Sequence, residues 1–148
     1  MQIELKKHRH QSGLTNLLLV ILKRLVAIFL LVFAVLYWAR IVGAFEASSM
    51  RFDTMSEPWQ IASVVLAVTM PIAAIGLWGL FSWGTSTWLL IVLIELSMFV
   101  WLKEYFGEAY YIVLFHSISL ATYIALKLSL MVTRKLTKRS NLQPVGTN

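Results

Sequence analysis

Four long apolar runs dominate this sequence and determine which folds are possible. They cover residues 25–45, 61–83, 87–103 and 110–132. A helix needs about 20 mainly apolar residues to cross the hydrocarbon core of a bilayer. The runs lack two-residue alternation and exceed the length of barrel strands, so they predict helices. We therefore expect an all-α fold, an integral membrane four-helix bundle without a separate soluble domain.

The composition agrees with a membrane protein and excludes several other classes. Hydrophobic residues make up 59% and charged residues 14% of the 148 residues, whereas soluble domains carry about 45–50% apolar and about 25% charged residues. The absence of cysteine excludes disulfides, thiolate metal sites and cysteine nucleophiles. The net charge of +6 resides mainly at the chain ends beside apolar runs. It forms no solvated basic patch, so we expect no nucleic-acid partner.

Prolines and a glycine mark the predicted borders of the spans. Pro58 precedes the second run, where a first helical turn tolerates a missing N–H. Pro71 lies within that run and predicts a kink. The segment 84–87, Gly-Thr-Ser-Thr, predicts a break followed by a helix N-cap. Because this connection is so short, the second and third spans are expected to be antiparallel neighbours.

The charges predict the orientation in the membrane. The segments 1–24 and 133–148 carry most of the basic residues, whereas the loops 46–58 and 103–109 are net acidic. Since Lys and Arg accumulate on the cytoplasmic side, both termini are expected to be cytoplasmic. Residues 1–24 then form a basic cytoplasmic segment, and residues 133–148 form a basic, partly disordered cytoplasmic tail.

Aromatic residues and a possible cleavage site bear on the first span. The rings of Tyr37, Trp38 and Trp59 are expected at the outer membrane border, where Trp and Tyr are enriched.

The first apolar run could also belong to a signal peptide, because basic residues precede it and Ala47-Ser48-Ser49 resembles a cleavage site. The length of the run and Arg40 within it favour an uncleaved anchor.

The fourth run carries a smooth face and a polar face on roughly opposite sides. Small residues recur at four-residue spacing, which allows close helix contact in lipid, although chance can also produce this spacing. They are Ser117, Ala121, Ala125 and Ser129. The polar face consists of His116, Tyr123, Lys127 and Arg134. Lys127 is expected near the cytoplasmic border, with its ammonium group reaching the headgroup region.

Glu95 is the most informative ionisable residue because it lies in the middle of the third run. An acidic side chain there costs about 2.5–3.5 kcal/mol on insertion scales, so it needs a partner or a proton. Arg40 and His116 are predicted within about two helical turns of its depth. We expect Glu95 to pair with Arg40 or to accept a hydrogen bond from His116. These residues form either a structural pair, which we prefer, or a proton relay or polar-ligand site.

Recognisable catalytic and metal-binding motifs are missing from the sequence. It contains no glycine-rich phosphate loop, no Gly-x-Ser-x-Gly turn and no HExxH helix. His8 and His10 are too few for a metal site, and His116 with Met98 is too little for haem ligation. We therefore expect no enzymatic activity, no cofactor and no metal.

Four short motifs resemble a known family. They are Tyr37-Trp38-Ala39-Arg40, Arg51-Phe52-Asp53, Pro58-Trp59 and Gly76-Leu77-Trp78. From about Lys23 to Arg139, the chain is similar to a family of small, uncharacterised four-span inner-membrane proteins of alphaproteobacteria. This resemblance implies an inner-membrane location in a Gram-negative cell and assigns no activity.

The architecture also resembles, more loosely, that of the DoxX-type membrane proteins. These proteins also have four spans and a tight central hairpin. The glycine-lysine signature expected there at the end of the first span is absent, and Arg40 stands nearby instead. Because this likeness concerns architecture alone, it transfers no function.

Two classes of function remain open. The small extramembrane mass and the smooth face of the fourth run favour a structural or accessory subunit. Such a subunit associates within the lipid bilayer with other membrane proteins or with copies of itself. The alternative is a small transporter, or a redox-coupled membrane subunit, that uses Glu95, Arg40 and His116.

Overall fold

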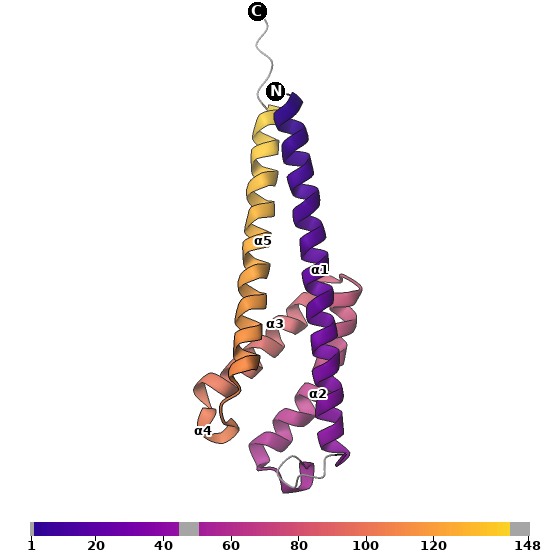
Figure 1. Ribbon diagram of the computed structural model, residues 1–148, viewed down its shortest axis with the longest axis vertical. Helices are drawn as coiled ribbons and strands as arrows, with labels where there is room; N and C mark the ends of the chain where they lie inside the picture. Colours follow the sequence, from indigo (N-terminus) through magenta and orange to yellow (C-terminus); the bar gives the residue numbers. More distant parts are fainter. Residues whose placement is uncertain (1, 45–50, 143–148) are drawn as a thin grey trace, which may run out of the picture. The chain divides into compact units, whose positions relative to one another are not determined.

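The computed structural model describes residues 2–44 and 51–142, and the side chains of residues 13–44 and 51–135 (Figure 1). The elements are α1 (Gln2–Ile41), the 3-10 turn η2 (Phe52–Thr54), α2 (Glu57–Trp78), α3 (Ser82–Leu96), the π-helical turn η3 (Ser97–Trp101), α4 (Lys103–Phe106) and α5 (Tyr110–Leu142). No strand occurs among the described residues. The predicted all-α fold is confirmed.

Four helical segments are long and apolar enough to cross a membrane. They are Gly13–Ile41, Glu57–Trp78, Ser82–Trp101 and Tyr110–Lys135. The chain divides into two compact units. Residues 23–117, which we call the central unit, contain the second part of α1, all of α2 to α4 and the first turns of α5. The other unit contains the beginning of α1 and the rest of α5.

The first helix begins earlier and ends earlier than the predicted span 25–45. Only one glycine and no proline interrupts residues 2–41, so the helix continues through the basic segment. It ends at Ile41, just before Gly43, whose φ of +71° is the left-handed conformation that glycine adopts at helix C-termini. Residues 45–50, which include the possible cleavage site, lie outside the described residues.

The break between α2 and α3 lies at residues 79–81, and the prediction of a break at 84–87 is wrong. Leu80 adopts a left-handed φ of +59° in this turn. Gly84 lies inside α3 and contacts Gly76 of α2, and a Cβ added at Gly84 would lie 2.2 Å from the Gly76 carbonyl carbon. Gly84 therefore allows close packing of α2 against α3, the expected neighbours, and does not break the helix.

Pro71 removes one hydrogen bond from α2, and α1 replaces it. Proline has no amide hydrogen, so the carbonyl of Ala67, four residues earlier, has no helical donor. The indole Nε1 of Trp38 donates to this carbonyl oxygen at 3.0 Å. The prediction placed Trp38 at the outer membrane border, and the structure adds a specific polar tie between α1 and α2.

The last helix extends further than the predicted span 110–132. Residues 133–142, expected within a partly disordered tail, continue α5. Residues 110–143 contain no glycine or proline, and the basic residues of this segment lie near the negative end of the helix dipole. Residues 143–148 lie outside the described residues.

The core of the central unit is apolar except for Ser63 and one acid–base pair. Side chains such as Leu30, Leu66 and Ile91 are fully buried. Among residues 13–44 and 51–135, no Asp, Glu, His, Lys or Arg side chain is buried except those of Glu95 and His116. The core thus points to these two residues as the centre of any polar site.

Candidate functional site

Glu95 and His116 contact each other inside the central unit. Oε2 of Glu95, near the end of α3, and Nε2 of His116, in the second turn of α5, form a hydrogen-bonded pair. The exposed fractions of their side chains are 1% and 0%. Of the two partners considered for Glu95, the structure therefore brings His116 to it. No ion pair between Glu95 and Arg40 occurs in the described part of the chain.

Each member of this pair keeps one buried polar atom without a partner. Oε1 of Glu95 and Nδ1 of His116 accept or donate no hydrogen bond within the described residues. Buried polar atoms are nearly always satisfied, because leaving one open costs about 1–3 kcal/mol. The pair can therefore take a proton, a water molecule or a polar ligand in addition to the bond that it already makes.

Aromatic rings shield the pair. The ring of Phe29 lies edge-on to His116, with centroids 6.1 Å apart, and it also stacks on Phe115.

The π-helical turn η3 begins two residues after Glu95 and follows α3 directly. Such turns are rare and often occur at functional sites.

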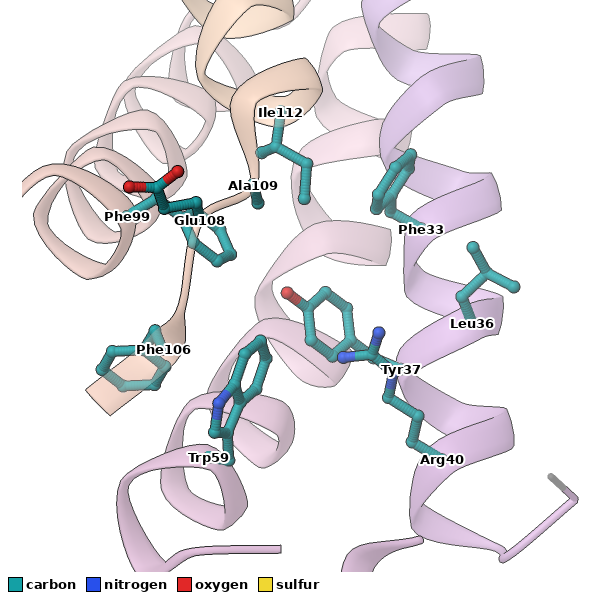
Figure 2. Close-up of a pocket in the computed structure, with 10 residues that line it drawn as sticks. All are labelled: Phe33, Leu36, Tyr37, Arg40, Trp59, Phe99, Phe106, Glu108, Ala109 and Ile112. Carbon is teal, nitrogen blue, oxygen red and sulfur yellow. The ribbon is translucent and has the colours of Figure 1, made fainter. Parts of the chain in front are cut away.

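The central unit also contains a pocket of about 240 Å³ (Figure 2). Its aromatic lining consists of Phe33, Tyr37, Trp59, Phe99 and Phe106, and its remaining lining residues are Leu36, Arg40, Glu108, Ala109 and Ile112. Phe99 follows Glu95 by four residues and Ile112 precedes His116 by four residues, which is about one helical turn in each case. The pocket therefore lies about one turn from the buried pair.

Arg40 is the cation of this pocket. Its guanidinium carbon lies 5.4 Å from the ring centroid of Tyr37 and 5.5 Å from that of Trp59. The side chain is half-buried, and the described residues include no acid paired with it. The two rings hold Arg40 through cation–π contacts, which are attractive over an aromatic face.

Tyr37 is one of the buried residues of the pocket wall. Figure 2 shows the Tyr37 hydroxyl pointing away from the α1 backbone. From the sequence, Tyr37 was expected only at the membrane border. Its spacing of four and three residues from Phe33 and Arg40 puts all three on one helix face, and this signal could have identified it.

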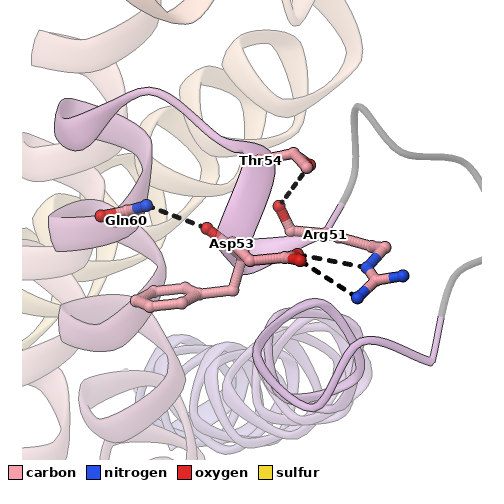
Figure 3. Close-up of polar contacts among 5 residues, drawn as sticks. Arg51, Asp53, Thr54 and Gln60 are labelled. Atoms are coloured by element: carbon pink, nitrogen blue, oxygen red, sulfur yellow. Dashed lines mark hydrogen bonds and ion pairs between the residues drawn. The ribbon is translucent and has the colours of Figure 1, made fainter.

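A polar cluster before α2 supports the pocket (Figure 3). Nε and a terminal nitrogen of Arg51 donate to the two carboxylate oxygens of Asp53 at 3.1 and 3.0 Å. The amide of Gln60 donates to the carbonyl of Phe52 at 3.0 Å. These contacts tie η2 to the first turns of α2, which provide the indole ring of the pocket.

The other predicted residues lie outside this site. Lys127 is exposed, with its Nζ 5.9 Å from the ring centroid of Tyr123. The four residues of the smooth face are all exposed; they are Ser117, Ala121, Ala125 and Ser129. Within residues 13–44 and 51–135, whose side chains the structure describes, no group of three or more His, Cys, Asp or Glu side chains could hold a metal ion.

Comparison with known proteins identifies the family. A profile described as "Family of unknown function (DUF6163)" matches residues 17–134. The chain belongs to this family. The DUF6163 match covers all of α2, α3 and α4 and most of the span-like parts of α1 and α5. No curated protein and no solved structure gives a significant match.

Proposed function

We propose that this DUF6163 protein is a multi-pass protein of a bacterial inner membrane that acts as a structural or accessory subunit and has no enzymatic activity. Its partners are the lipid bilayer and a second membrane protein or a second copy of the chain. The basic segments 1–24 and 133–148 and the acidic loops between them support cytoplasmic termini. In this orientation the pocket beside Arg40 lies toward the periplasm.

The observation that carries this proposal is the open smooth face of α5. Its four small residues are exposed over three turns. In lipid, such residues favour helix association because they let two backbones approach closely. The short loops between the spans leave little protein outside the membrane for a separate activity. A partner helix in the bilayer fits both observations.

Native mass spectrometry of the protein extracted from its own membranes in mild detergent tests this proposal. We expect a complex with another membrane protein or with a second copy. The double variant Ala121→Leu, Ala125→Leu should dissociate the complex. Met131→Phe adds volume at an exposed site away from the smooth face and should leave it intact. A lone monomer at native abundance contradicts the proposal.

The Glu95–His116 pair favours a second candidate function, a small proton-coupled transporter or redox-coupled subunit. A purely structural pair gains from having every polar atom satisfied, because a partly satisfied buried network is less stable than an apolar replacement. Here Oε1 of Glu95 and Nδ1 of His116 are open. This arrangement suits groups that bind and release a proton.

Two variants distinguish a proton relay from a purely structural role of the Glu95–His116 pair. Glu95→Gln keeps the shape of the side chain but cannot carry a proton between partners. In liposomes with an internal pH dye, a relay predicts loss of proton flux at unchanged protein yield. A structural tie predicts that Glu95→Gln lowers the yield, while the apolar pair Glu95→Leu, His116→Phe restores it.

A further inference from the structure

The pocket beside Arg40 carries two opposite charges that do not neutralise each other. Arg40 of α1 and Glu108, just before α5, both line the pocket (Figure 2). Within the described chain, no ion pair or hydrogen bond joins these two side chains. Separated opposite charges around one cavity are complementary to a ligand that itself carries both charges at a distance.

The guanidinium group of Arg40 suits a phosphate. The aromatic rings of Tyr37 and Trp59 lie near the guanidinium group, within cation–π distance. No ion pair among the described residues involves Arg40, so no acid occupies its N–H donors. A guanidinium edge binds phosphate oxygens through two parallel hydrogen bonds.

The pocket lies at the end of the membrane spans, where headgroups reside. Its residues come from the end of α1, the start of α2, the region after α3 and the start of α5. Successive spans reverse direction, so these four ends share one membrane surface. With a volume of about 240 Å³, the pocket is smaller than typical small-molecule sites of about 300–1,000 Å³. It therefore suits a headgroup whose acyl chains remain in the bilayer.

We propose that this pocket binds the phosphoethanolamine headgroup of a zwitterionic phospholipid. The phosphate contacts the edge of Arg40, and the ammonium group is attracted to Glu108 and to the neighbouring aromatic faces. This inference goes beyond the proposed function and does not depend on it. An accessory subunit and a transporter would both present this pocket to the headgroup region.

Native mass spectrometry in detergent with added lipid tests the proposal. The probes are phosphatidylethanolamine, and phosphatidylglycerol, which has the phosphate but no amine. We expect retention of phosphatidylethanolamine to exceed that of phosphatidylglycerol by about tenfold, the value of one charge-assisted contact. Equal retention of the two lipids overturns the proposal. Soluble phosphoethanolamine that binds as tightly as the lipid would assign the pocket to a water-soluble phosphate ester instead.

Matched variants test what Arg40 and Glu108 each contribute to lipid binding. Arg40→Gln should weaken binding of both lipids by about tenfold, and Glu108→Gln should abolish the preference for phosphatidylethanolamine. Lys103→Gln and Glu104→Gln remove exposed charges at the same end of the spans but outside the pocket, so they should change nothing. Equal losses in the control variants contradict a specific site. Should Arg40→Gln not fold, the exposed Glu108→Gln still decides the outcome.

Discussion

The two ends of the central unit are held together in different ways. At the turn between α2 and α3, Gly76 and Gly84 bring two backbones into contact. A neighbouring groove of about 360 Å³ is lined by apolar residues alone. At the other end, aromatic rings surround Arg40 and a pocket that also holds Glu108. Close backbone contact provides rigidity without polar chemistry, whereas the ring-lined end combines space with charge.

The largest loss of stability is expected where the polar end meets the core. Glu95→Ala leaves Nε2 of His116 buried without a partner and opens a cavity, which should lower the free energy of unfolding by on the order of 3 kcal/mol. Leu93→Ala, on the exposed side of α3, should be nearly neutral. Thermal melting in detergent measures both. Similar melting temperatures for the two variants would show that the pair contributes little.

The glycine contact should be the next most sensitive feature. Gly84→Ala places a Cβ against the backbone of Gly76, which cannot move aside as a side chain can. We expect destabilisation of about 1–3 kcal/mol from overpacking. Gly13→Ala, whose Cβ would meet nothing within 4 Å, provides the control and should be neutral or stabilising. Equal melting temperatures for both variants would rule out a tight α2–α3 contact.

Loss of the hydrogen bond from Trp38 to the Ala67 carbonyl should have an intermediate effect on stability. Trp38→Phe removes the indole donor and leaves the Ala67 carbonyl open, at a cost of about 1 kcal/mol. Pro71→Ala restores the amide donor to that carbonyl, so Trp38→Phe should be less harmful in that background. A double-mutant cycle measures this coupling. Additive effects of the two substitutions would contradict the compensation.

The smallest effect is expected in the loop before α2. Asp53→Asn breaks an exposed pair with Arg51, in which the side chains are 61% and 48% exposed. Such pairs contribute about 0.2–1 kcal/mol. Because salt screens exposed charges, the difference in melting temperature from the wild type should vanish in 1 M salt. A difference that persists in high salt would indicate that Asp53 acts through packing.

The apolar runs were sufficient to predict the helices but not their contacts. Length and hydropathy identify four spans because the bilayer imposes these properties on any crossing helix. Gly84 was misread because a glycine that breaks a helix and one that packs against another helix look alike in sequence. The donor for Ala67 was beyond prediction, since it comes from a residue 29 positions away in another helix.

The candidate site was predictable only in part. Burying an acid demands a partner, and this physical requirement singled out Glu95 and limited the partners to Arg40 and His116. The pocket was not foreseen, because rings such as Tyr37 and Trp59 also fit a membrane border. Only the arrangement of the helices distinguishes rings that face lipid from rings that enclose a cavity.

The π-helical turn η3 separates the buried pair from the pocket along the same segment. A π-helical turn contains an extra residue compared with an α-helical one. Deleting one residue within 97–101 should return this stretch to α-helical geometry and swing Phe99 around the axis, while Glu95 keeps its place. Chain length alone, without any change of charge, would then remove one ring from the pocket wall and leave the Glu95–His116 contact in place.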